Sequence, residues 1–324
     1  MSIALGTAPA DALSMNKFLL PLLLLFPGGA YAAQQQFSLD AVTLETLRAM
    51  PLSPAPAVTI PLSAEARPAD KYFNAYILKA VDCLNSKYRL LGYDIHSVLT
   101  HDIPYYTYGT IPATHAPLTM CVAAQMEIIL TAYQLYAQET GDYSVYDYLP
   151  AHSFQGLSIT DLKGHIWVNP EFNSNGTADA LINFGMGERT VFEKLKPGSF
   201  VNINRTTNTG HAVTFIGYIN IKGEVQPVYN DTVVGFKYFS SQGQAQAGSG
   251  GFDYRYAVFE KFGCPDLPFK RDCNVIYSTD QKYLNTGTML SPKFWTHIMP
   301  RPDQVPGRET IFNGAFFNGR TTDD

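Results

Sequence analysis

Clustered positive charge and nucleotide-binding motifs are both missing from this sequence. Only 16% of the 324 residues are charged, the formal net charge is -5, and the lysines and arginines form no basic patch. Binding to a phosphate backbone needs such a patch, so nucleic acid is not expected as a partner. The chain also lacks a phosphate-binding loop, a dinucleotide fingerprint and a Gly-x-Ser-x-Gly motif. No cofactor is therefore expected.

The sequence offers no spacing of metal ligands either. Zinc sites are typically marked by histidines at i and i+4 on a helix or by Cys-x-x-Cys pairs. Neither spacing occurs among five scattered histidines, which are His96, His101, His152, His165 and His297. We therefore predict no metal site.

Long apolar runs are confined to the first part of the chain. A basic residue precedes an apolar stretch at 19–26, and a small-x-small sequence ends at Ala32. The stretch is shorter than the about 20 residues that span a bilayer, and the whole pattern is typical of a secretory signal peptide. We predict a signal peptide at 1–32, within which 1–14 would be a gene-model extension before a true start at Met15. The mature protein is then expected to be periplasmic or secreted, without stable membrane insertion.

Export affects the four cysteines, because an oxidising compartment allows disulfides. Cys264 and Cys273 are close in sequence and have prolines between them, so they are the easiest pair to join. Cys83 and Cys121 would then either bond to each other or both remain thiols. The sequence leaves these two alternatives open.

A proline-rich stretch separates the signal peptide from the expected folded domain. Residues 33–69 are rich in glutamine, proline and alanine, and their five prolines exclude a long helix or an inner strand. We predict an extended N-terminal arm at 33–69, followed by a single domain at 70–324.

Within that domain, the hydrophobic pattern changes from helical spacing to strand-forming runs. The helical spacing predicts helices at 70–92, 122–136, 143–148, 158–164 and 177–184. The strand-forming runs predict strands at 199–204, 212–219, 225–230, 236–239, 254–262 and 275–277. Helices followed by strands indicate an α+β fold, in which the helical N-terminal half packs on a C-terminal antiparallel sheet.

Cys121 stands at the start of a strongly apolar helix. Thr119 is suited to cap the N-terminus of this helix, and Gly141 is suited to end it. The backbone N–H groups and the positive dipole end of a helix N-terminus favour thiolate over thiol and can steady an oxyanion. Cys121 is therefore a candidate nucleophile, although a cysteine on an apolar helix is more often a core residue or half of a disulfide.

A histidine and an asparagine further along the chain complete a catalytic order. His211 opens a strand after a Thr-Asn-Thr-Gly turn, so a rigid strand can hold it across a cleft. A thiol nucleophile needs an imidazole within hydrogen-bond reach, and the imidazole needs a partner on its other nitrogen. Asn230, or Asp231 beside it, ends the next expected strand. We therefore predict Cys121, His211 and Asn230 as the catalytic residues.

The second half of this pattern resembles the papain-like cysteine hydrolases. The sequence Leu-Lys-Pro-Gly-Ser-Phe-Val at 195–201 precedes Gly-His-Ala-Val-Thr-Phe-Ile-Gly-Tyr at 210–218. Both are similar to the bacterial cell-wall branch, the CHAP amidases and NlpC-type endopeptidases. The resemblance covers 117–262 and implies a papain-like fold, with Cys121 as nucleophile, His211 as general base and acid, and Asn230 as orienting residue. It also implies hydrolysis of amide bonds in peptidoglycan stem peptides or envelope proteins.

The sequence departs from that family at several positions. Met120 and Val122 flank Cys121, where the cell-wall enzymes have Asp or Gly-x before the cysteine and Ser-Gly or Gly after it. The oxyanion glutamine of papain has no counterpart. The segment 240–243 can also be aligned with the Asn-Ser-Trp-Gly of papain, which would leave Asn230 structural. Two alternatives stay open, a transglutaminase-like acyltransferase and a catalytically inactive binding or inhibitor module of the cell envelope.

Overall fold

The described part of the chain is a mixed α+β unit. The structure is a computed structural model, and it describes residues 71–148, 168–169, 174–267, 270–296 and 321–322. These residues belong to one compact unit at 64–324. The predicted signal peptide, the proline-rich arm and the expected helix at 158–164 lie outside the described residues. Among the residues described, no helix is long and apolar enough to cross a membrane.

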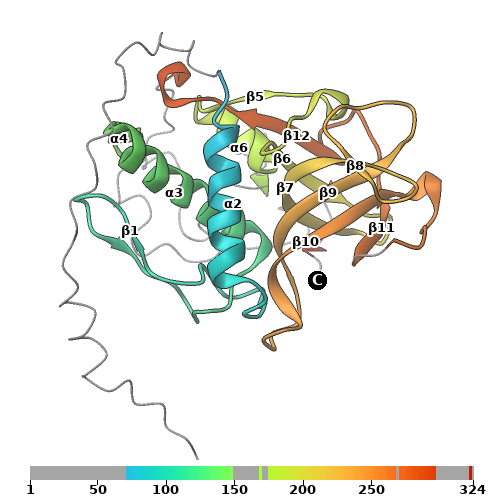
Figure 1. Cartoon of the computed structure of the whole chain (residues 1–324), viewed down its shortest axis with the longest axis horizontal. Helices are drawn as coiled ribbons and strands as arrows, with labels where there is room; N and C mark the ends of the chain where they lie inside the picture. Colours follow the sequence, from blue (N-terminus) through green and yellow to red (C-terminus); the bar gives the residue numbers. More distant parts are fainter. Residues whose placement is uncertain (1–70, 149–167, 170–173, 268–269, 297–320, 323–324) are drawn as a thin grey trace, which may run out of the picture. The chain divides into compact units, whose positions relative to one another are not determined.

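Two long helices, α2 (Asn74–Tyr88) and α3 (Cys121–Thr140), pack against each other on one side of the large sheet (Figure 1). Both agree with the predicted helical spacing. α3 is buried on every side from Cys121 to Tyr133, because its residues there are almost all apolar. The shorter helical elements are α4 (Val145–Tyr148), α6 (Thr177–Asn183), η3 (Phe192–Lys194), η4 (Glu260–Phe262) and η5 (Pro292–Phe294).

The two ends of α3 differ in how well the sequence predicted them. Gly141 ends the helix in the left-handed conformation, with φ of 73°, and its N–H donates to the Ala137 carbonyl oxygen at 2.9 Å, as expected. The prediction that Thr119 caps the N-terminus is wrong. Thr119 forms an isolated β-bridge with Tyr93, so it is extended, and Met120 precedes the helix without a capping side-chain hydrogen bond.

The large sheet has the strand order β11-β10-β9-β7-β6-β12-β5, and β8 and β13 also pair with β7. Its strands are β5 (Gly187–Arg189), β6 (Phe200–Asn204), β7 (Thr209–Asn220), β8 (Val225–Gln226), β9 (Val233–Gly243), β10 (Gly250–Phe259), β11 (Arg271–Val275), β12 (Leu284–Met289) and β13 (Thr321–Thr322). Two small hairpins pair β1 (Ile103–Pro104) with β2 (Thr110–Ile111) and β3 (Val168–Asn169) with β4 (Ser174–Asn175).

The sheet is mixed, and the prediction of a purely antiparallel sheet is wrong in this respect. β11 runs parallel to β10, and β13 runs parallel to β7. A parallel neighbour cannot follow through a two-residue hairpin and needs a longer connection. The segment between β10 and β11 supplies one, so β11 approaches the sheet from the same end as β10.

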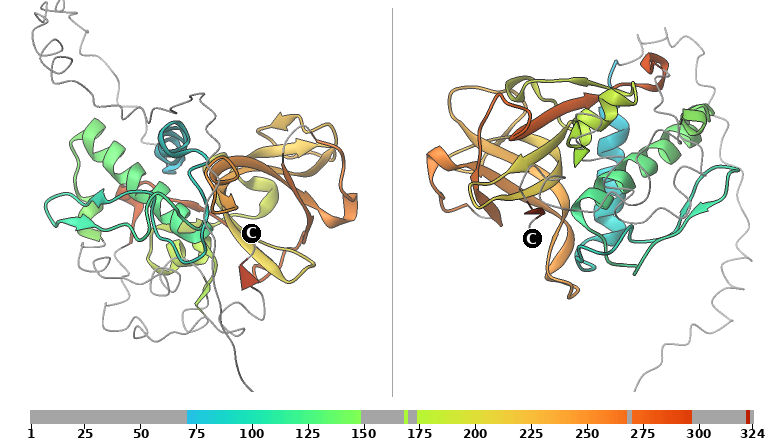
Figure 2. Two further views of the ribbon diagram at one scale, coloured as in Figure 1. Left: turned by 90° about the horizontal axis from the view of Figure 1, so that it is seen from below. Right: turned by 180° about the vertical axis from the view of Figure 1, so that it is seen from behind.

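Five strands close into a ring whose interior is the second hydrophobic core. β11 pairs along β10 and returns to the end of β6, where Ile276 N donates to Asn204 O at 2.9 Å and Thr206 N donates to Asn274 O at 3.0 Å. The strands β6, β7, β9, β10 and β11 therefore curl round on themselves beside the helices (Figure 2).

Alternation along these strands separates two cores, because successive side chains point to opposite faces. The face that packs on α2 and α3 carries Phe200, Ala212, Phe239, Phe252 and Met289. The interior face carries Val201, Ile203, Val213, Phe215 and Tyr238.

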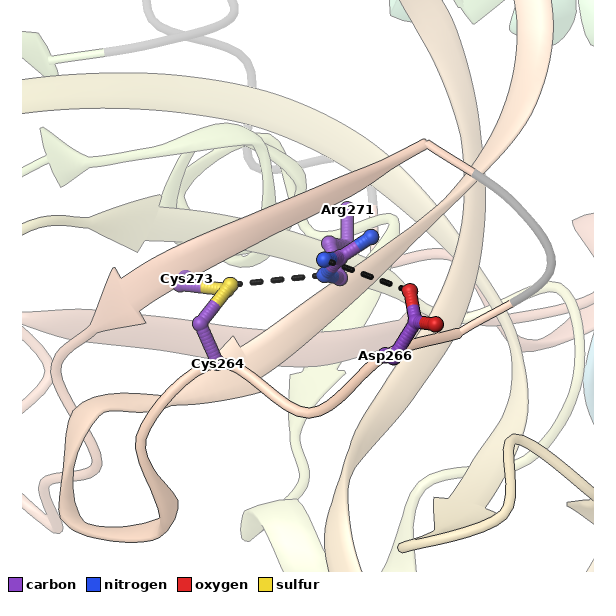
Figure 3. Close-up of a disulfide and its surroundings, with 4 residues drawn as sticks. All are labelled: Cys264, Asp266, Arg271 and Cys273. Carbon is purple, nitrogen blue, oxygen red and sulfur yellow. Dashed lines mark hydrogen bonds and ion pairs between the residues drawn. A yellow bond between two sulfur atoms is a disulfide. The ribbon is translucent and has the colours of Figure 1, made fainter.

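A disulfide joins Cys264 to Cys273, as predicted, and thereby ties the segment after β10 to β11 (Figure 3). Arg271 lies beside it, with Nε 3.3 Å from the Cys264 sulfur and Nη2 3.7 Å from Asp266 Oδ1. Cys83 and Cys121 are both thiols, so the alternative disulfide between them does not form.

Candidate active site

Cys121 is the first residue of α3 and is completely buried, with 0% of its surface exposed. It precedes the first helical hydrogen bonds, so the backbone N–H groups of the opening turn surround it. This is the position at a helix N-terminus that the sequence predicted for the candidate nucleophile.

The first turn of α3 sits where β7 and β9 separate. The paired residues of these two strands extend from Asn220–Val233 to Thr214–Phe239 and stop there. Beyond that point β7 continues through 209–213 and β9 through 240–243. We call the place between these two segments the β7–β9 gap.

Gln125 connects α3 to the strands on both sides of the β7–β9 gap by hydrogen bonds. Its Nε2 donates to the Ala212 carbonyl oxygen (3.2 Å) and to Ser240 Oγ (3.4 Å), and its Oε1 accepts from Thr214 Oγ1 (2.7 Å). The same Nε2 lies 3.5 Å from the carbonyl oxygen of Cys121, one helical turn earlier. Gln125 thus joins the first turn of α3, where Cys121 lies, to both strands through one buried side chain.

Ser240 and Ser241 reinforce this junction from β9. Ser240 Oγ donates to the Ala212 carbonyl oxygen at 2.6 Å, and Ser241 Oγ donates to the Thr119 carbonyl oxygen at 2.9 Å. Thr119, before Cys121, is therefore bonded to β9, and Gln125, after it, is bonded to both β7 and β9. These bonds fix the position of the first turn of α3 relative to the two strands.

His211 lies at the rim of the same gap, directly before Ala212 on β7, and it too is 0% exposed. Its imidazole points into the space enclosed by the strands, where the imidazole centroid lies 5.9 Å from the centroid of the Tyr238 side-chain ring. Ser240 is two residues after Tyr238 and so lies on the same face of β9. Its hydroxyl nevertheless accepts a hydrogen bond from Gln125 of α3, because the two strands are separated at this point. Gln125 therefore links α3, one turn after Cys121, to the backbone of Ala212 beside His211, while the His211 side chain lies on the opposite face of β7, inside the ring of strands.

A buried polar network lines the interior side of His211. The Tyr238 hydroxyl donates to Asp272 and accepts from Gln242 Nε2 at 2.9 Å. Arg205 Nη2 lies 3.0 Å from Asp272 Oδ2. Burial opposes ionisation of Asp272, but the charge of Arg205 and the hydrogen bonds from Tyr238 and Arg205 outweigh it and hold the pKa of this carboxyl below its usual value.

His211 is neutral in this environment. Burial lowers the pKa of the imidazole to about 3, and the Arg205 and Arg255 guanidinium groups add to the shift against the opposing Asp272 carboxylate. Burial also raises the pKa of the Tyr238 hydroxyl well above its usual value. Near neutral pH the His211 imidazole is therefore uncharged and its burial opposes protonation, while Tyr238 keeps its proton and remains a hydrogen-bond donor.

We expect the stability of the protein to fall below about pH 6.5 because of His211. The pKa of this group is about 3 in the folded chain and 6.5 as its ordinary value. Between these values the unfolded chain binds a proton that the folded chain does not, so the free energy of unfolding decreases as the pH falls. The stabilisation is complete above pH 6.5 and is lost toward pH 3, at up to about 1.4 kcal/mol per pH unit.

Urea denaturation of the wild type and of His211→Gln, from about pH 4 to 7, measures this effect. The wild type should show the steeper dependence on pH, by up to one proton. Equal slopes would mean that the pKa of His211 is the same in the folded and unfolded chain, which would contradict the expected effect of burial.

Asn230 lies at the other end of β7. It is exposed in the turn before β9, where its Oδ1 accepts from Thr232 N at 2.9 Å and its Nδ2 donates to Gln226 Oε1 at 3.0 Å. This turn adjoins Asn220, the last residue of the 12-residue β7. At about 3.3 Å per residue it is roughly 30 Å from His211. The structure therefore does not bring Asn230 or its neighbour Asp231 to His211, and the side chain of Asn230 orders its own turn instead.

Several residues of this site were not predicted from the sequence. Gln125 carried a usable signal, because a glutamine within an apolar helix must find buried hydrogen-bond partners. The segment 240–243, considered as an alternative to Asn230, does line the β7–β9 gap. Arg205, Tyr238 and Asp272 carried no local signal, since they meet only when the ring of strands closes.

The comparisons with known proteins add nothing to this geometry. No family model matches the chain, and no curated protein or solved structure is detectably similar to it. Among the described residues, no group of three or more histidine, cysteine, aspartate or glutamate side chains is arranged to hold a metal ion.

Proposed function

We propose that this protein is an exported thiol hydrolase that cleaves amide bonds, with Cys121 as nucleophile and His211 as general base and acid. The observation that supports the proposal is that Gln125 bonds to the carbonyl oxygens of Cys121 and of Ala212, the residue after His211, so both candidate residues adjoin the β7–β9 gap. A cysteine at a helix N-terminus and a histidine at the start of a neighbouring strand also support a papain-like arrangement.

In the proposed reaction, His211 takes the proton of the Cys121 thiol as the sulfur attacks the amide carbonyl carbon. The resulting oxyanion is stabilised by backbone N–H groups of the first turn of α3. The C–N bond then breaks, and the leaving amine takes the proton from His211, which leaves a thioester on Cys121. Water gives a proton to His211 and attacks the thioester, and the departing sulfur recovers that proton.

We assign the orienting role to the 240–243 side of the gap in place of Asn230. The Tyr238 ring touches that of His211, and Gln242 and Asp272 hold the Tyr238 hydroxyl. These contacts restrict the imidazole without requiring an asparagine. The position of Asp231 at the far end of β7 from His211 removes the support for a transglutaminase-like acyltransferase, which relied on Asp231.

The substrates we propose are peptidoglycan stem peptides or proteins of the cell envelope. This choice follows from the expected signal peptide and from the Cys264–Cys273 disulfide, which is compatible with an oxidising compartment such as the periplasm or the exterior. The complete burial of both Cys121 and His211 favours a second candidate function, a papain-like binding or inhibitor module without catalysis.

Trapping of the acyl-enzyme distinguishes the two. We expect that mixing the mature protein with purified peptidoglycan or a denatured protein, followed by acid quenching and peptide mapping, reveals a thioester adduct on Cys121. Cys83, a thiol on α2, serves as the internal control and should remain unmodified. Product formation without any adduct on Cys121, or the absence of both, would contradict the thiol mechanism.

A further inference from the structure

A strand from the far end of the chain lies directly beside the candidate active site. β13 pairs in parallel with β7, so that Thr321 is opposite Thr209 and Thr322 is opposite Gly210. Gly210 immediately precedes His211. On its other edge, Gly210 already pairs with Asn204 of β6. β13 therefore occupies the edge of β7 that faces the β7–β9 gap.

This position is the one that β9 leaves vacant. β9 covers the same edge of β7 from Asn220 to Thr214 and then diverges from it. An exposed strand edge offers main-chain N–H and C=O groups that another extended segment can pair with. β13 takes that place for two residues, directly before His211 and Ala212, and the Ala212 carbonyl oxygen accepts from Gln125, one helical turn after Cys121 on α3.

The pairing of β13 with β7 matters because the neighbouring candidate site is completely buried. Both Cys121 and His211 are 0% exposed, although an amide of a large substrate has to reach the sulfur. β13 and β7 are joined by only two pairs of residues, whereas β9 and β10 are joined by nine. β13 is therefore held to β7 by fewer paired residues than β6 is, and it costs less to displace from this end of β7.

We propose that β13 is an intramolecular strand that closes the β7–β9 gap, and that it must leave the edge of β7 before Cys121 can be reached from solution. Its role as a regulator of catalysis rests on the proposed function. Its role as a cover over Cys121 does not, because it concerns only access to the sulfur.

The test compares the alkylation of two thiols in one folded chain. Proline has no N–H and cannot complete the pairing, so Thr321→Pro with Thr322→Pro should detach β13. Thr321→Val with Thr322→Val is the matched control, because valine keeps the preference for a strand. With iodoacetamide and peptide mapping, we expect the proline variant to react at Cys121 about tenfold faster or more, since the rate follows the open fraction. The valine variant should react like the wild type.

Cys83 separates local opening from unfolding, because it lies on α2 and is partly exposed already. Its rate of alkylation should be the same in all three proteins. The proposal is overturned if Cys121 stays protected in the proline variant. It is equally overturned if Cys83 and Cys121 become reactive together, because β13 would then support the whole fold rather than cover one site.

A reversible lock tests the same idea without weakening the fold. Thr209→Cys with Thr321→Cys places thiols at positions that are opposite each other in the parallel pairing. In the oxidised, cross-linked form we expect Cys121 to resist alkylation beyond the wild-type level, and mild reduction should restore that level. Rapid alkylation of Cys121 in the cross-linked form would overturn the proposal. Because the readout is thiol access, a failure of the hydrolase proposal alone would leave these results unchanged.

Discussion

Replacing Cys121 by alanine is expected to lower kcat for hydrolysis by about 10⁴-fold or more, since the covalent step has no other nucleophile to carry it. The substitution removes only a sulfur atom from a buried site, so α3 should keep its place through Gln125, which bonds to backbone and hydroxyl groups of β7 and β9. Initial rates on peptidoglycan and on a denatured protein, measured with circular dichroism as a check of folding, give the comparison.

Cys83→Ala is the matched control for this experiment. It removes the other free thiol, which lies on α2 outside the β7–β9 gap, and should leave kcat unchanged. Retention of hydrolysis in folded Cys121→Ala protein would exclude the thiol mechanism. Loss of hydrolysis in both variants would indicate a general effect on the fold rather than a nucleophile.

Asp272→Ala is expected to lower the free energy of unfolding by about 3–5 kcal/mol, because it leaves the Arg205 guanidinium buried without its counter-charge. The Arg205 side chain is only 6% exposed and that of Asp272 16%. The substitution also removes the acceptor of the Tyr238 hydroxyl, and both groups lie inside the ring of strands. Urea denaturation monitored by tyrosine fluorescence measures the loss.

Two further variants separate the ion pair from a general effect of mutation. Asp266→Ala removes the carboxylate that lies 3.7 Å from Arg271, but its side chain is fully exposed at 102%, so we expect the free energy of unfolding to stay unchanged. Arg205→Met combined with Asp272→Leu removes both buried charges, and the double variant should be more stable than Asp272→Ala. If Asp272→Ala and Asp266→Ala lose equal stability, the buried pair does not have the assigned role.

Local patterns in the sequence were sufficient for the main elements of the fold. The apolar spacing located α3, and Gly141 located its end, because helix period and left-handed termination depend on neighbours along the chain. The strand-forming run at 212–219 located β7, and the Cys264–Cys273 disulfide followed from sequence proximity. The sequence also placed Cys121 and His211 near the starts of their helix and strand, for the same local reason.

The tertiary structure decided everything that depends on how distant strands are paired. Asn230 follows β8 in sequence order, yet the antiparallel register places it at the opposite end of β7 from His211. Asp272 meets Arg205 only because β11 returns to β6, and β13 meets Gly210 only because β9 diverges after Thr214. No local period encodes which strand is adjacent or where two strands separate, so the position of Cys121 at the start of α3 was readable from the sequence, while the residues that surround it and the pairing of β13 were not.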